Sequence, residues 1–348
     1  MAKLLIQSMG CPNCGAPYEP KTRICRFCNS VLIVTSLAET FERSFAAHQV
    51  AGSLEKWRQR LKDDPDSAEA HFALGLSYLN SKLRDAALVH LRKAVILAPE
   101  VADTHHNLAL TLLNDGNIDV TSPEYAEAVK EIDYSVQLAP DFGESIAFKH
   151  IFVARKLDAV DQAQALAEYR KAVDVCPDIA TLQHNLGWCY LNLKNTAEAE
   201  NCFQRAIDLD SGYHLAYSIL CQIMFDQRKY ERGIQLGMKA VSLMGPATSD
   251  ETQAIAHSNL SLCLWMSHRT SEALEHAKKA IAYAPANPRF QQNLLGIQNV
   301  PRPEKDWDEP EQAEADSGSN GLGKVIAITL GIIVLCNVLA TVYGKFAK

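Results

Sequence analysis

The stretch "LGWCYLNLKNTAEAENCFQRAIDLDS", residues 186–211, decides the fold because it recurs along the chain. A near copy, "LGLSYLNSKLRDAALVHLRKAVILAP", occupies residues 74–99, and a weaker copy follows Leu260. The second half of each copy keeps three residues at matching spacing: Ala199, Phe203 and Ala206; Ala87, Leu91 and Ala94; Ala273, Ala277 and Ala280. Self-similarity at one period predicts stacked repeat units instead of one closed core.

This pattern resembles the tetratricopeptide repeat (TPR), a helix-turn-helix of about 34 residues whose small residues let paired helices approach closely. Three clear units are expected at 68–101, 180–213 and 254–287, and degenerate units at 102–142, 143–179 and 214–247. The resemblance implies a mostly α fold, a TPR-like right-handed α-solenoid over residues 66–299 that ends in a C-terminal capping helix. Residues 37–65 are expected to form N-terminal capping helices, because an uncapped solenoid exposes apolar faces.

In this family, fixed positions of each unit's first helix line the concave groove. Carried over residue by residue, they are Phe72, Leu76, His106, Asn107, Leu110, His184, Asn185, Trp188, Ser218, Gln222, Phe225, Asn259, Leu262 and Trp265. The set is apolar and aromatic with three periodic asparagines, and it lacks the lysines of the family's carboxylate clamp. We expect the asparagines to bond the backbone of a partner peptide or helix while the rings bury its side chains. Alternatively, Trp188 and Trp265 are covered within the solenoid and the asparagines tie neighbouring helices.

A second motif, "CPNCGAPYEPKTRICRFC", occupies residues 11–28 and places two Cys-x-x-Cys pairs close together. Two such turns supply four thiolates, Cys11, Cys14, Cys25 and Cys28, for a tetrahedral Zn²⁺ at about 2.3 Å. The stretch resembles a zinc ribbon, with an apolar strand before it, a second strand at 31–35, and a domain over 1–36. Gly15 and Asn29, after the second cysteine of each pair, tolerate a positive φ.

The four thiols could serve a catalytic zinc, a redox pair or a structural zinc. A catalytic zinc needs an open coordination position, and four thiolates leave none. A redox pair of the thioredoxin kind belongs near a βαβ pattern, which is missing here. A structural Zn²⁺ is therefore the interpretation, and no catalytic residue is assigned. The six other cysteines are scattered through apolar helical sequence, which suits a reducing compartment.

Basic and aromatic residues surround the second cysteine turn and give a competing function. Lys21, Arg23 and Arg26, with Tyr18 and Phe27, could grip nucleic acid. The composition as a whole is ordinary, at 47% apolar and 22% charged with net charge −7. A basic surface supplies most non-specific phosphate affinity, so this charge argues against general coating of nucleic acid. Nucleic-acid binding thus stays open only through the ribbon.

After Val300 the composition changes sharply. Residues 300–322 carry seven carboxylates and almost no apolar residues, which predicts a flexible linker. The stretch "VIAITLGIIVLCNVLATVY", residues 325–343, has no charge. As a helix it would span about 28 Å, close to the bilayer core, so a transmembrane helix is predicted at 323–344. Asn337 could bond across a helix dimer, which leaves homo-oligomers open.

Together these features predict a membrane-anchored scaffold or adaptor that is not an enzyme. The C-terminal helix would act as a tail anchor with the bulk of the chain in the cytosol, since moving a short tail across a membrane is easier than moving a folded domain. The groove would bind a protein partner. The alternative is a zinc-ribbon regulator, associated with nucleic acid or the ribosome and tethered to a membrane.

Overall fold

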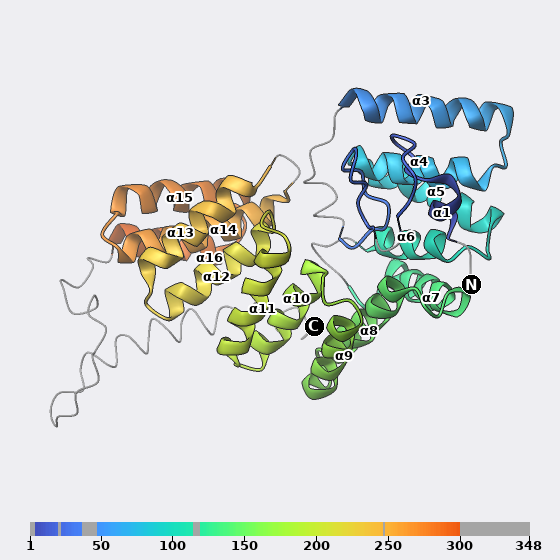
Figure 1. Ribbon diagram of the computed structural model, residues 1–348. Coiled ribbons are helices and arrows are strands. Elements are labelled where there is room, and N and C mark those ends of the chain that lie inside the picture. The colour runs from blue at the N-terminus through green and yellow to red at the C-terminus, as the bar shows by residue number, and fades with distance from the viewer. Residues whose placement is uncertain (1–3, 20–21, 37–46, 114–118, 246–247, 300–348) are drawn as a thin grey trace.

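The structure, a computed structural model, describes residues 4–19, 22–36, 47–113, 119–245 and 248–299 (Figure 1). Apart from the short α1 (Leu5–Met9), the helices are α3 (Ala47–Asp63), α4 (Ala68–Asn80), α5 (Arg84–Leu97), α6 (Ala102–Leu112), α7 (Pro123–Leu138), α8 (Gly143–Leu157), α9 (Gln162–Val175), α10 (Ala180–Asn192), α11 (Thr196–Leu209), α12 (His214–Asp226), α13 (Tyr230–Leu243), α14 (Asp250–Met266), α15 (Thr270–Tyr283) and α16 (Pro288–Asn299). From α4 onward they form pairs, and each helix packs mainly on its neighbours in sequence. The mostly helical, TPR-like solenoid is therefore confirmed.

Glycines let the two helices of a pair approach closely. A Cβ built on Gly75 of α4 would lie 2.7 Å from the Leu91 side chain of α5, and Gly187 of α10 is equally tight against α11. In the fifth unit a glycine of the second helix instead lets the next unit approach: a Cβ on Gly233 of α13 would lie 2.6 Å from Cys263 Sγ of α14. Separations this short cannot hold a methyl group, so the small residues are a packing requirement.

The turns inside the units share one backbone device. The second residue after the first helix has a positive φ in four units: Lys82, Lys194, Arg228 and His268. The N–H of the following residue then reaches back five residues, as from Leu83 to the carbonyl of Tyr78 at 2.9 Å. This is the Schellman end of a helix, here built without glycine. Basic side chains at these sites also suit the partial negative charge of a helix C-terminus.

The N-terminal stretch corrects one expectation. The described part of the chain contains no strand, and residues 24 and 31 form an isolated β-bridge. Residues 5–9, expected as a strand, form the one-turn helix α1. Residues 31–35 contain bends and form no strand ladder: the N–H groups of Val31 and Val34 bond side chains of α4 and α6, and those of Leu32 and Ile33 bond the carbonyl of Arg23. The predicted β character of the ribbon was therefore wrong.

Both ends of the solenoid have a covering helix. At the start, Trp57 of α3 packs on Leu74 of α4 in a small apolar cluster. At the end, Phe290 of α16 is buried against α14 and α15. The predicted linker and transmembrane helix, residues 300–322 and 323–344, lie outside the described residues. Among the helices that the structure does describe, none is long and apolar enough to cross a membrane.

Candidate metal centre and partner-binding face

The four cysteines of the N-terminal stretch come together. All four sulfurs lie within 4.8 Å of one another. Cys11 Sγ is 3.5 Å from Cys28 Sγ, and Cys14 Sγ is 3.5 Å from Cys25 Sγ, with all four present as free thiols. Four sulfurs at about 2.3 Å from a tetrahedral zinc would be about 3.8 Å apart. The cluster is therefore compatible with a zinc site.

Two matching turns hold these sulfurs. Gly15 and Asn29 have φ values of 75° and 61°, which confirms the positive φ expected after each pair. Their N–H groups bond back to the carbonyls of Cys11 and Cys25 at 2.8 Å. Burial raises the pKa of the Cys11 thiol well above its usual value, although backbone N–H groups directed at its sulfur oppose that rise. A buried thiolate here needs a cation, which is the condition that a metal ion meets.

The first helices of the units form the surface named here the inner face, and the described part of residues 4–36, the metal module, docks on its early part, α4 and α6. The most extensive contact is made by residues 30–36, the docking segment. The N–H of Val31 donates to Asn80 Oδ1 at 3.1 Å, and that of Val34 donates to Asn107 Oδ1 at 2.8 Å. Asn107 Nδ2 in turn donates to the carbonyl of Leu32 at 3.4 Å. Side-chain amides thus bind main-chain groups of this segment.

His106, which precedes Asn107 on α6, also binds the docking segment. Its Nε2 lies 2.9 Å from the carbonyl oxygen of Val34, which can only accept, so the ring carries its proton on Nε2. Nδ1 is then the acceptor, 3.0 Å from the hydroxyl of Ser145. Burial lowers the pKa of His106 to about 4, which keeps the ring neutral. The expected lining residues His106 and Asn107 are therefore covered by the chain's own docking segment.

Asp103, on α6, is a contact residue that the sequence prediction missed. Its two carboxylate oxygens accept the N–H groups of Leu5 and Ile6 at 2.9 Å, at the start of α1. Burial raises the pKa of Asp103 to about 6, and the N–H donors act against that rise. Asp103 lies three residues before His106 and four before Asn107, which places it on the same side of α6. This helical spacing could have predicted it as a contact residue.

Two further contacts hold the metal module from other sides. The carbonyl of Pro12 accepts from Ser53 Oγ at 2.8 Å and from Trp57 Nε1 at 2.7 Å, both on α3. Arg23 lies 2.9 Å from Glu144 of α8 and bonds Asp178, between α9 and α10, at the same distance. The module therefore bridges elements from the N-terminal cap, α3, to the third unit; the short α1 lies beside α6 (Figure 1).

Arg23 bears on the nucleic-acid alternative. Its side chain is only 17% exposed and is engaged by carboxylates. Arg26 and Phe27 remain exposed, at 72% and 73%, although Arg26 pairs with Glu19. Lys21 lies outside the described residues. Two exposed residues are a small surface for phosphate and base contacts.

The remaining lining residues differ in exposure. Phe72, Leu76, Leu110, Ser218, Asn259 and Leu262 are buried, and His184, Asn185, Gln222, Phe225 and Trp265 are half-buried. Trp188 is 40% exposed, so it is not sealed inside the solenoid. Asn259 Nδ2 donates to the carbonyl of Ser218 at 3.1 Å and so ties α14 to α12, as the alternative interpretation expected. The expected residues of α4 and α6 are thus all buried, those of α10 are half-buried or exposed, and those of α12 and α14 are mixed.

The surface around Trp188 on α10 carries unused hydrogen-bonding groups. Trp188 Nε1 donates to His184 Nε2 at 2.9 Å, which leaves the His184 proton on Nδ1. Neither His184 Nδ1 nor Asn185 Nδ2 has a hydrogen-bond partner in the described part of the chain. Arg155 approaches the other amide atom, Asn185 Oδ1, at 3.4 Å. Both atoms are themselves buried, so two unpaired donors lie beneath an exposed indole.

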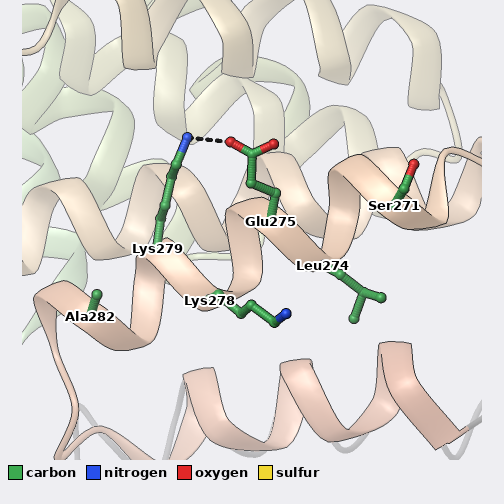
Figure 2. A pocket seen from close by; sticks show the side chains of 6 residues that line it. All are labelled: Ser271, Leu274, Glu275, Lys278, Lys279 and Ala282. Carbon is green, nitrogen blue, oxygen red and sulfur yellow. Dashed lines mark hydrogen bonds and ion pairs between the residues drawn. The ribbon is translucent and has the colours of Figure 1, made fainter.

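One hollow lies away from all of these residues. It has a volume of about 550 Å³ and is lined by Ser271, Leu274, Glu275, Lys278, Lys279 and Ala282, all of α15. Figure 2 shows Glu275 and Lys279 paired on one side of the helix, at 2.6 Å, and Leu274 and Lys278 on the side toward α16. Because its polar groups do not converge, nothing marks it as a binding site.

Comparison with known proteins finds tetratricopeptide repeats at residues 44–102 and 180–213. The first match begins ahead of the expected first unit and includes α3, so this helix follows the repeat pattern. Neither match reaches the four cysteines. The type IV pilus assembly protein PilF of Pseudomonas aeruginosa is 23% identical over 169 residues, which cover 49% of this chain and 64% of PilF. The chain thus matches less than two thirds of that protein.

Solved structures show the same fold. The APC/C hetero-tetramer Cut9–Hcn1 matches with a TM-score of 0.58 and 16% identity, covering 75% of this chain and 48% of the other. The human IFIT1 dimer with m7Gppp-AAAA matches at 0.54 and 19%, covering 73% and 59%. PilF of Pseudomonas aeruginosa matches at 0.50 and 19%, covering 66% and 96%. At these identities the likeness shows the fold alone.

Proposed function

We propose that this chain, which carries tetratricopeptide repeats, is a membrane-anchored scaffold without catalytic activity that binds a segment of a partner protein on its inner face. The observation that carries the proposal is the contact at Asn107. Its amide bonds both the N–H of Val34 and the carbonyl of Leu32, so this face already binds the main chain of a peptide segment. Such contacts to the main chain give affinity without demanding one particular sequence.

Asn185 is the counterpart of Asn107 in the fourth unit. It lies at the equivalent position of its first helix, and its Nδ2 has no partner in the described part of the chain. A polar group that is removed from water and unpaired costs about 1–3 kcal/mol, which a backbone carbonyl of a partner would recover. Trp188 stands one helical turn away and offers an amphipathic ring of the kind that anchors interfaces. The partner site is therefore assigned to α10 and α12.

The four thiols are proposed to hold a structural Zn²⁺. Four thiolates complete the coordination of zinc and leave no position for a substrate or water, which is why no activity is proposed. A short cysteine-rich stretch has too small a core to fold alone, and metal binding supplies that free energy. Elemental analysis of the purified full chain should give one zinc per chain, lost in the variant Cys11→Ser. A chain purified under reducing conditions without zinc would contradict this part.

The anchor is proposed from sequence. Residues 325–343 would insert in a membrane with the bulk of the chain cytosolic, and the acidic stretch before them would give reach. Confinement to one surface raises the effective concentration of partners on that surface. Removal of residues 323–348 should move the protein from the membrane fraction to the supernatant after alkaline extraction. Retention of the truncated chain would contradict the anchor.

Site-specific photocrosslinking tests the partner site. Benzoylphenylalanine replaces Trp188 in the full chain, and a matched variant carries it at Ile96 of α5, whose side chain is 72% exposed. A specific protein adduct is expected from position 188, absent at position 96 and reduced when Asn185→Ala is added. Identical adducts from both positions, or none from position 188, would refute the assignment.

A further inference from the structure

We propose that the docking segment is a built-in ligand of the inner face, and that the metal centre decides whether a partner can replace it. With the metal bound, residues 30–36 cover α4 and α6. When the metal is lost, a β-branched segment of a partner protein takes the same place. This deepens the function proposed above and rests on it for its biological use, but its test does not involve the site on α10.

The first argument is the chemistry of the contact. Asn80, His106 and Asn107 bond only main-chain groups of the docking segment. A fixed structural core would instead be expected to use a strand ladder or side chains of matched shape. These amide and imidazole contacts do not depend on the identity of the bound side chains. Another segment can therefore satisfy the same four hydrogen bonds.

The second argument is the apolar character of what is bound. The side chains of residues 31–34, "VLIV", are all buried and belong to the same apolar cluster as Phe72, Leu76 and Leu110. Burial of four apolar side chains is strongly favourable, so the segment does not leave this face for water. It leaves only in exchange for a segment that covers the same surface. The partner segment is thus expected to be rich in valine and isoleucine.

The third argument links the segment to the cysteines. Ser30 begins the docking segment, and its Oγ lies 3.2 Å from Cys28 Sγ and 2.9 Å from Asn13 Nδ2. The carbonyl of Ser30 accepts the N–H of Cys25 at 2.8 Å. The start of the segment is therefore fixed by both cysteine turns. Its place on the inner face is pre-arranged for as long as those turns stay closed.

Pre-arrangement decides the competition. A tethered segment acts at an effective concentration on the order of millimolar, and one already ordered by the metal site loses little entropy on binding. A free partner cannot displace it under those conditions. Without the metal, residues 11–28 lose their main source of order. Docking of the segment then also has to order this stretch, which costs conformational entropy. The affinity advantage of the docking segment over a partner segment is then smaller.

A peptide-binding assay on the full chain tests this. The probe is a fluorescein-labelled peptide with the sequence of residues 29–36, "NSVLIVTS", followed by fluorescence anisotropy. We expect saturable binding to protein stripped of metal by a chelator and at least about tenfold weaker binding to the zinc-loaded protein. Asn107→Ala should weaken binding to the stripped protein by about tenfold or more, while the matched variant Asn185→Ala should not. A peptide N-methylated at the position of Val34 cannot donate to Asn107 and should bind as poorly.

Hydrogen exchange gives a second readout that needs no peptide. Removal of the metal should speed exchange at the amides of Val31 and Val34 and leave α10 to α15 unchanged. The proposal is overturned if those two amides stay protected in the stripped protein, since the segment is then a permanent part of the core. Equal peptide binding to loaded and stripped protein also overturns it, as does stripped protein that binds the N-methylated peptide equally well. Failed crosslinking at Trp188 alongside peptide binding here would remove only the site on α10.

Discussion

Replacement of Asn107 by alanine should weaken the docking of the metal module while the helices remain folded. The substitution removes three hydrogen bonds: from Val34 N–H at 2.8 Å, to the carbonyl of Leu32 at 3.4 Å, and to the carbonyl of Asp103 at 2.9 Å. It also leaves the N–H of Val34, a fully buried residue, without its acceptor. An unpaired buried donor costs about 1–3 kcal/mol, and each lost bond contributes about 0.5–1.5 kcal/mol. We expect a loss of about 2–4 kcal/mol in docking free energy, after allowing for the long bond to Leu32.

Native-state hydrogen exchange measures this loss at the docking segment. A cost of 2–4 kcal/mol corresponds to exchange at Val34 that is faster by about thirtyfold to several hundredfold. The matched control is Asn185→Ala, at the equivalent position of the fourth unit. Its side chain accepts one bond from Arg155 at 3.4 Å, and its Nδ2 has no partner in the described residues. This control should change stability by less than about 1 kcal/mol. Equal losses in both variants, or none at position 107, would refute the role given to Asn107.

Three further predictions follow from packing, protonation and charge. Gly75→Ala should lower the free energy of unfolding by about 1–3 kcal/mol in urea, because its new Cβ would lie 2.7 Å from Leu91, despite alanine's higher helix propensity; unchanged stability would count against this packing. Burial lowers the pKa of His71, and it lowers the pKa of its partner His90 to about 4. Below about pH 6.5 the unfolded chain therefore binds protons at these two histidines more readily than the folded chain does. Stability from this pair should be lost as pH falls from about 6.5 to 4, and His90→Gln should flatten that dependence in denaturation curves; identical wild-type and variant curves would contradict it. Arg23→Ala should speed amide exchange in the metal module by about tenfold without changing nucleic-acid retention at any salt, whereas a salt-sensitive loss of retention would favour the competing function.

Most of the fold was predictable from the repeat pattern. Residues such as Gly75 and Gly187 act locally, between two helices adjacent in sequence, so their spacing predicts their packing. The β-branched residues 31–34 show where this reasoning fails. Their strand propensity is real, but the groups that bond them lie on α4 and α6, far along the chain. Whether residues of high strand propensity form a strand depends more on such tertiary contacts than on local preference.

The candidate site was predicted in part for the same reason. The type of contact at Asn107, an amide that bonds a backbone, was expected from its place in the repeat. The identity of what it bonds was not, because periodicity places a residue on a face but does not say which distant segment covers that face. The clustering of Cys11, Cys14, Cys25 and Cys28 was predictable, since paired turns at short spacing act locally.

The contacts of the metal module also change how the array should come apart. In a simple solenoid each unit interacts only with the next, so units open independently from the ends. Here one small module touches α3, α4, α6, α8 and the connection before α10. Those elements should therefore melt as one cooperative block. None of these contacts reaches α10 to α16, so this half should fray unit by unit, which gives the molecule one all-or-none half and one graded half.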